Sequence, residues 1–225
     1  MIKKSTNHIP WDSEIFGMPC YEILEYSAEN FNSIRNKKGH YTIRVHPLDS
    51  KSLLHQYGFY FCDTLIKVAC HQNEFNMNIL KGFDLNIQIA SKKSELKDFC
   101  KKIFVYDRFH RDFNLVTDSA DDRFQVWLEK IFDEGSIYLL KNGNEVSGFV
   151  GVKDNKLLLH AIFDKFQGKG LSKYYWSKVC ENLFTMGHKE ICSSISSSNL
   201  AVINLYTSIG FRFMEAHDIY HLLND

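Results

Sequence analysis

The sequence predicts an α/β (α+β) protein in which helices cover both faces of one mixed, mostly antiparallel sheet. Three observations lead to this class. Runs rich in β-branched and aromatic residues alternate with segments whose apolar residues recur at helical spacing. Asn-Gly and Asp-Asn turns join three of the predicted strands directly, which is typical of an antiparallel meander. The chain of 225 residues with 44% hydrophobic residues is also long enough to bury a large core.

The N-terminal part carries short and mixed signals. We expect strands over residues 20–26 and 41–45, a helix over 49–57 that Gly58 ends, and a strand-rich run over 59–70. The polar segment 73–82 is the best candidate for a connector. We therefore divide the chain into a smaller α/β N-terminal half, residues 1–82, and a second domain, residues 83–225.

The second domain has a clearer pattern. A strand over 84–90 precedes a helix that Ser91 can cap, with apolar residues at helical spacing: Leu96, Phe99, Cys100, Ile103 and Phe104. An amphipathic helix over 119–132 follows. The remaining predicted elements are strands over 136–141, 145–153 and 156–163, a helix over 169–186, a strand over 189–195, a helix over 199–209 and a strand over 211–222.

Composition excludes several classes of protein. The 27 basic and 27 acidic residues cancel, which argues against a nucleic-acid binder. The longest apolar run, 157–163, is far shorter than the roughly 18 residues of a membrane helix, and the N-terminus has no signal-peptide pattern. The six cysteines form no C-x-x-C pair, which favours core thiols in a reducing compartment over a metal centre. We expect a cytoplasmic protein without metal, membrane or nucleic-acid partners.

The junction at residues 162–172 is the most informative segment. A strand ends at Ile162, a loop with Gly168 and Gly170 follows, and a long helix begins. Backbone N–H groups at a helix N-terminus bind anions, and glycines allow a pyrophosphate to approach closely. Lys169 adds a positive charge. The alternative is an ordinary loop-to-helix turn, because the segment matches neither the P-loop nor the dinucleotide fingerprint.

A second segment lies downstream and carries Asn199, Leu205-Tyr206 and Gly210-Phe211. Together with Q-G-K-G-L-S at 167–172, it resembles the acetyl-CoA-binding core of the GNAT acyltransferase superfamily. Ser172 stands where that family carries Gly or Ala, but Ser is also small. The resemblance implies the GNAT fold and acetyl-CoA as co-substrate. It implies these cofactor-binding residues: Ile162, Gln167, Gly168, Lys169, Gly170, Leu171, Ser172 and Asn199.

The same resemblance implies that Tyr206 is the general acid. A phenol has a pKa near 10 and can donate its proton to a departing thiolate in a dry pocket. The alternative is a core tyrosine whose hydroxyl is satisfied by the protein. Asn199 is a helix N-cap, a contact of the pantetheine arm, or both.

Four further segments narrow the resemblance: W-D-S-E-I-F-G at 11–17, Y-G-F-Y-F-C-D-T-L at 57–65, D-R-F-H at 107–110 and R-F-x-x-W at 123–127. The series resembles the bacterial dTDP-fucosamine (dTDP-4-amino-4,6-dideoxygalactose) acetyltransferases, which serve lipopolysaccharide and O-antigen synthesis. This implies a nucleotide-linked amino sugar as acceptor, with Arg108, Phe109 and His110 in its pocket. A solvated basic loop is the alternative for these three residues.

The general base is the least determined part of the site. Asp63 lies in an otherwise apolar strand, where burial would raise the pKa of its carboxyl and suit it to accept a proton. The alternative for Asp63 is a surface position on an edge strand, with His160 as the rival base.

Two other functions also stay open. One is acetylation of protein, peptide or other small-molecule amines, and the other is CoA binding without catalysis. The oligomeric state is open too, with a homodimer as one option.

Overall fold

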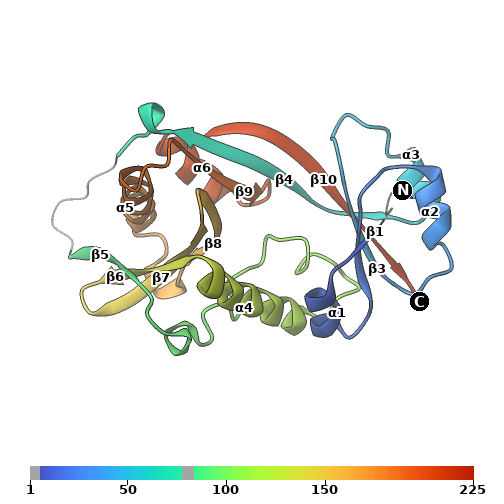
Figure 1. The fold of residues 1–225 in the computed structure, drawn as a ribbon, viewed down its shortest axis with the longest axis horizontal. Helices are drawn as coiled ribbons and strands as arrows, with labels where there is room; N and C mark the ends of the chain where they lie inside the picture. Colours follow the sequence, from blue (N-terminus) through green and yellow to red (C-terminus); the bar gives the residue numbers. More distant parts are fainter. Residues whose placement is uncertain (1–5, 78–83) are drawn as a thin grey trace.

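The computed structural model describes residues 6–77 and 84–225. Its strands form one sheet in the order β1-β2-β3-β10-β4-β9-β8-β7-β6-β5 (Figure 1). The strands are β1 Thr6–His8, β2 Cys20–Ile23, β3 Gly39–Val45, β4 Tyr60–His71, β5 Leu85–Ile89, β6 Ser136–Asn142, β7 Glu145–Lys153, β8 Lys156–Ile162, β9 Glu190–Ser196 and β10 Arg212–Asn224. The α-helices are α1 Pro10–Phe16, α2 Ala28–Ile34, α3 Ser52–Gln56, α4 Thr117–Glu134, α5 Leu171–Thr185 and α6 Leu200–Ser208.

The sheet is mixed and mostly antiparallel. Only the pairs β2–β3 and β8–β9 are parallel among the described strands. The strands β6 to β8 form the meander that the turns predict, and β5 pairs antiparallel with β6. The predicted fold class is therefore confirmed.

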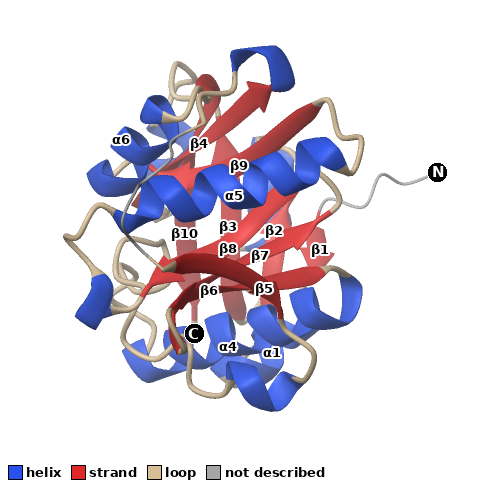
Figure 2. Ribbon diagram, turned by 90° about the vertical axis from the view of Figure 1, so that its left-hand side faces the viewer, coloured by secondary structure: helices blue, strands red, loops and turns tan. Residues whose placement is uncertain are grey.

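Helices cover both faces of the sheet, as the alternation along β6 shows (Figure 2). Tyr138 and Leu140 pack in the cluster that includes residues of α5 and α6. Their neighbours Ile137 and Leu139 point the other way and pack with residues of α4. Side chains alternate between the two faces of a strand, so α4 lies on the face opposite α5 and α6. None of the helices in the described part of the chain has the length and apolar character that a membrane span requires.

Two long strands, β4 and β10, run through both halves of the molecule (Figure 1). The C-terminal end of β10, 218–224, pairs with β3, while residues 212–221 pair with β4. The N-terminal strands therefore extend the sheet of the second half. The predicted division between residues 82 and 83 stays a prediction, and residues 78–82 of the expected connector lie outside the described residues.

The prediction of a helix after Ser91 is wrong. The segment has one short 3-10 helix, Lys93–Leu96, followed by turns in which Asp98 and Lys102 have positive φ angles. Side chains of α4 explain this difference. The backbone N–H of Cys100 donates to Gln125 and that of Lys102 donates to Asp121, so these donors are satisfied without a helix. Leu96 and Cys100 are still buried, so the apolar spacing marked core positions correctly.

A buried ion pair ties α1 to α4. The Arg123 Nε atom donates to Asp12 Oδ1 over 2.9 Å, and both residues are less than a tenth exposed. The Arg123 guanidinium also lies 4.3 Å from the ring centroid of Trp11 and 3.8 Å from that of Phe109. Both ionic and aromatic contacts therefore hold α1 against α4.

Replacing Arg123 with Met should lower the free energy of unfolding by roughly 3 kcal/mol, because the Asp12 carboxylate would stay buried without its cation. Urea denaturation followed by tryptophan fluorescence measures the loss. Lys93→Met is the control, since its ion pair with Asp133 is about half exposed and should matter little. Equal losses of unfolding free energy in the two variants would show that the buried ion pair stabilises the fold no more than the exposed one.

Candidate active site

The site begins where β8 and β9 separate. The two strands pair only at Lys156↔Cys192 and Leu157↔Ser193 among the described residues. Beyond that point β8 continues beside β7 up to Ile162, and β9 continues beside β4 up to Ser196. The facing edges of β8 and β9 thus carry backbone groups that the ladder does not use, and a ligand can pair with them.

Tyr206 places its hydroxyl between these two strands. The Tyr206 hydroxyl lies 2.9 Å from His160 Nε2 on β8 and 3.1 Å from Ser193 Oγ on β9. The residue is completely buried, and burial raises the pKa of its phenol well above the ordinary value. The phenol is therefore protonated at neutral pH and can act as a donor. Both the acid role and the structural alternative are compatible with these contacts.

The predicted phosphate loop follows β8 directly. Gly170 has a φ of 71° and precedes the first residue of α5, and no side chain in the described part of the chain caps that helix. The first N–H groups of α5 are therefore available to an anion. Gln167 donates its amide to the carbonyl of Ile162 and to Asp164 Oδ1, each over 2.9 Å, so it holds the loop against the end of β8.

The other predicted cofactor residues lie around this loop. Gly168 has a φ of 72° and, like Lys169, is exposed. Leu171 is buried in the core and Ser172 is half-buried in the first turn of α5. Asn199 caps α6, because its Oδ1 atom accepts from the Val202 N–H over 3.2 Å. The cap alternative for Asn199 is thus observed, and a contact with pantetheine stays a prediction.

Asp63 lies in the interior of the sheet, since β4 stands between β10 and β9. The edge-strand alternative for Asp63 is therefore wrong. Its Oδ1 atom accepts from Ser196 Oγ over 2.7 Å, from the Thr64 N–H over 2.8 Å and from Arg111 Nη1 over 3.1 Å. Its Oδ2 atom is buried and has no hydrogen-bond partner among the described residues. Burial raises the pKa of the Asp63 carboxyl, although the Ser196 and Arg111 contacts oppose that shift.

The loop with Arg108, Phe109 and His110 packs between the two halves. Phe109 is buried, and its ring contacts Phe16 and the guanidiniums of Arg108 and Arg123. His110 binds Asp107 over 2.5 Å and Asp121 over 3.2 Å, which fixes the loop to α4.

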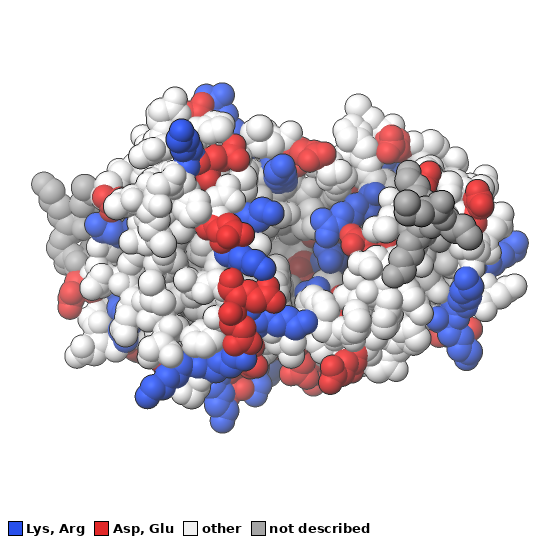
Figure 3. Space-filling view, in the orientation of Figure 1, with Lys and Arg blue, Asp and Glu red and all other residues white. Residues whose placement is uncertain are grey.

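Arg108 and Phe109 line a cavity of about 180 Å³. The cavity wall also contains Trp11, Tyr21, His40, Arg44 and Arg123, among other residues. The buried Arg108 Nε atom has no hydrogen-bond partner among the described residues. Burial, together with Arg123 and Arg44, lowers the pKa of Arg108 to about 10, so it is still a cation at neutral pH. Figure 3 shows a hollow between the two halves of the molecule, with Lys and Arg side chains on both of its sides.

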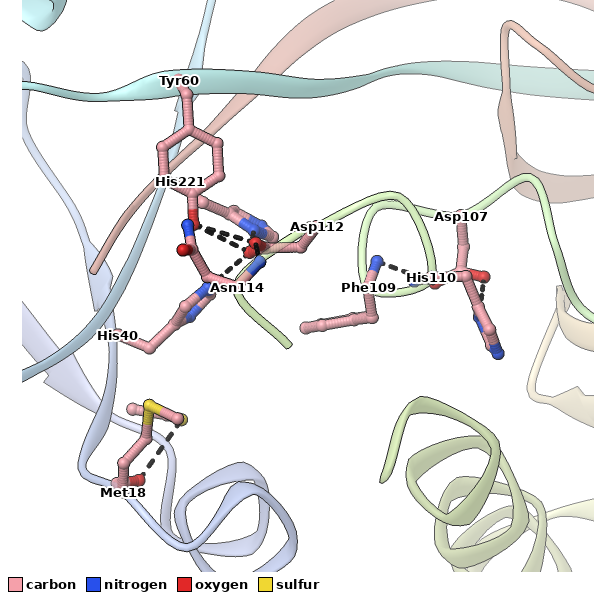
Figure 4. A network of polar contacts seen from close by, with 10 residues as sticks. Met18, His40, Tyr60, Asp107, Phe109, His110, Asp112, Asn114 and His221 are labelled. Carbon is pink, nitrogen blue, oxygen red and sulfur yellow. Dashed lines mark hydrogen bonds and ion pairs between the residues drawn. The ribbon is translucent and has the colours of Figure 1, made fainter. Parts of the chain in front are cut away.

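Sequence reasoning missed a buried cluster beside this cavity (Figure 4). Asp112 Oδ2 lies 2.8 Å from His40 Nε2 and 2.7 Å from His221 Nδ1, and the Tyr60 hydroxyl donates to the same carboxylate. Burial alone would raise the pKa of Asp112, but the hydrogen bonds from His221 and His40 bring it well below the usual value. The only sequence signal was a pair of histidines within apolar strands, which specifies no partner.

The possible ligand atoms of His40, Asp112 and His221 lie within 4.8 Å of one another, which is close enough to hold a cation. The hydrogen bonds of this cluster satisfy the Asp112 carboxylate without a metal, and the buried Nε2 atom of His221 has no partner among the described residues to orient the ring as a ligand. A structural clamp between β3, β10 and the 107–112 loop explains the contacts better. The expectation that no metal is needed stays a prediction.

Comparisons with known proteins agree with this geometry. The model of the acetyltransferase (GNAT) family matches residues 103–211. No curated protein sequence matches the chain. A GCN5-related N-acetyltransferase from Sphaerobacter thermophilus has a similar structure, with a TM-score of 0.66, 8% identity, and coverage of 97% of this chain and 76% of that one. A conserved protein of unknown function from Staphylococcus epidermidis has a TM-score of 0.67 and 13% identity, with coverage of 100% and 94%.

A third solved structure is described as a GCN5-related glucosamine N-acetyltransferase region in a fungal multi-domain β-N-acetylglucosaminidase. Its TM-score is 0.62 at 9% identity, and the match covers 91% of this chain and 30% of that one. These likenesses show that the chain has the GNAT fold. The family model matches slightly less than half of the chain, and the fold is the one that the GNAT acetyltransferases, a family that uses acetyl-CoA, share.

Replacing Gly170 with Val should raise the Kd for acetyl-CoA at least about tenfold. A β-branched residue strains the left-handed backbone, and its side chain would project into the open space at the α5 N-terminus. Calorimetric titration measures the affinity, and circular dichroism checks the fold.

The matched control is Gly187→Val at the other end of α5. Gly187 also has a positive φ, 100°, and a Cβ atom added there would meet nothing within 4 Å, so the strain is comparable. This variant should keep its affinity for acetyl-CoA. If both variants lose affinity equally, the α5 N-terminus is not the pyrophosphate site.

Proposed function

We propose that the chain transfers the acetyl group of acetyl-CoA to an amine by direct attack in a ternary complex. The observation that carries this proposal is the placement of Tyr206 and Asp63 along β9. Tyr206 contacts Ser193 and Asp63 contacts Ser196, three residues further on the same strand, whose side chain points to the other face of the sheet. Both contacts lie at the β8–β9 opening, so a proton donor and a proton acceptor stand on the two sides of the gap where a thioester and an amine would meet.

The chemistry needs one proton removed and one supplied. The neutral amine nitrogen attacks the thioester carbon, and its proton passes to Asp63 Oδ2, the carboxylate oxygen that has no partner among the described residues. The carbon–sulfur bond then breaks. Tyr206 gives its proton to the departing sulfur. Burial suits both residues to these roles, because it makes the Asp63 carboxylate a stronger base and keeps the Tyr206 phenol protonated.

The proposed acceptor is a nucleotide-linked 4-amino-4,6-dideoxy sugar of the dTDP type, used for surface polysaccharide synthesis. The sequence resemblance suggests this substrate, and the cavity that Arg108 lines supports an acceptor that carries phosphate. Arg44 and Arg123 line that cavity too, together with Trp11. Guanidinium groups recognise phosphate, and an aromatic ring can stack on a base. His110 contributes by holding the loop through Asp107 and Asp121.

We further propose a cytoplasmic location, which the free thiols of the six cysteines support. A homodimer is one assembly compatible with this function. The alternative functions are acetylation of protein, peptide or other small-molecule amines, and CoA binding without catalysis. The buried Tyr206 beside the β8–β9 opening favours a catalytic chain over a binding module.

An activity screen with acetyl-CoA separates these acceptors. The panel contains dTDP- and UDP-linked amino sugars, the same amino sugars without a nucleotide, and basic peptides. We expect turnover with a nucleotide-linked sugar, and Arg108→Ala should raise its KM at least about tenfold by removing an anion contact. Turnover of peptides alone would contradict the sugar proposal, and no release of free CoA with any amine would contradict the enzyme proposal.

Asp63→Asn should lower kcat/KM at least about a hundredfold, because the amide cannot accept the proton. In the wild-type chain, the acid limb of the pH profile of kcat/KM should lie above the usual carboxyl range near pH 4, since burial raises the pKa of Asp63. Arg111→Gln removes the cation that opposes this shift and should move the limb to still higher pH. If the acid limb does not move in Arg111→Gln and Asp63→Asn keeps full activity, Asp63 has a structural role only.

A further inference from the structure

The direction of the hydrogen bonds around Tyr206 can be deduced from the contacts of Ser193. The Ser193 hydroxyl donates its single proton to the carbonyl of Leu157 over 2.9 Å. Ser193 can therefore only accept from Tyr206, whose own proton points towards Ser193. The Tyr206 oxygen is then the acceptor of its contact with His160, and the Nε2 atom of His160 must carry the hydrogen.

This arrangement matters because a phenolate is costly at this position. Tyr206 is fully buried, and no cation contacts its hydroxyl among the described residues. A buried anion without a counter-charge is strongly disfavoured. An acid that gives its proton to sulfur here therefore needs a new proton at the same time.

His160 can supply that proton without carrying a charge itself. Burial lowers the pKa of His160 to about 4, so the ring is neutral and has one N–H group at neutral pH. The ring packs against Trp176 at 4.9 Å and Tyr206 at 5.8 Å between centroids, and neither neighbour is charged. A neutral imidazole can give a proton from one nitrogen while it takes one at the other.

We propose that His160 is a proton-relay residue that acts through Tyr206 in the proposed acetyl transfer. As the carbon–sulfur bond breaks, the Tyr206 proton turns from Ser193 to the sulfur. The Nε2–H proton of His160 passes to the Tyr206 oxygen, and the Nδ1 atom takes a proton from water. Asp63 gives the proton it received from the amine to the hydroxide so formed, and free CoA thiol, neutral Tyr206 and His160 and the Asp63 carboxylate result. A later exchange with water returns the imidazole to its first tautomer.

This role differs from that of a general base for the amine, the alternative for His160 that the sequence leaves open. A base acts on the amine independently of Tyr206, whereas a relay works only while the phenol is present. The two roles therefore predict different behaviour when both side chains are replaced.

The experiment is a double-mutant cycle with Tyr206→Phe and His160→Gln, measured on the amine that the activity screen selects. We expect each single variant to lower kcat about a hundredfold with little change in the KM for acetyl-CoA. The double variant should be no slower than the slower single one. His71→Gln is the matched control, since this partly exposed histidine on β4 contacts Glu190 rather than the phenol, and it should leave kcat unchanged. Imidazole in solution should restore part of the activity of His160→Ala.

Calorimetric titration with acetyl-CoA confirms that each variant is folded and binds. A double variant whose loss of kcat equals the product of the two single losses would contradict the relay and favour the base role. Wild-type kcat in His160→Gln would contradict the relay while leaving the proposed function intact. A wild-type chain that acetylates no amine would contradict the proposed function, and the relay with it.

Discussion

The early end of the pairing between β8 and β9 is the constraint on which the site depends. Each strand keeps its outer partner, β7 or β4, so neither can follow the other past Leu157 and Ser193. The Tyr206 hydroxyl bridges the two strands just beyond this point, and the loop that leads into α5 begins where β8 ends. One feature of the sheet thus brings a buried phenol, free strand edges and a helix N-terminus to the same place.

The proposed acceptor side depends on the N-terminal half. Because β10 and β4 continue into that half, His221 and Tyr60 reach the loop that carries Asp112, and His40 joins them from β3. The clamp on Asp112 fixes its neighbour Arg111, whose guanidinium bonds to Asp63 and to Ser198. The two buried carboxylates therefore differ in their contacts: both oxygens of Asp112 are hydrogen-bonded, whereas Asp63 Oδ2 has no partner among the described residues.

The sequence predicted the features that are local. The meander, α4 to α6 and the loop before α5 follow from turn residues, helical spacing and glycines. The helix expected after Ser91 was wrong because its N–H groups find partners on α4. The strand β1 and the helices α1 and α2 have only 3 to 7 residues, too few for a periodic signal. The Asp112 cluster joins residues 72 and 109 positions apart, which no local pattern specifies.

A crystal structure of the complex with CoA tests the central claim, the binding of acetyl-CoA in the β8–β9 opening, most directly. The account predicts a pantetheine arm along the free edge of β8, a pyrophosphate on the first N–H groups of α5 and the CoA sulfur within hydrogen-bond distance of the Tyr206 hydroxyl. A pyrophosphate elsewhere, or a sulfur out of reach of Tyr206 while His160 and Ser193 keep both of its contacts, would contradict it.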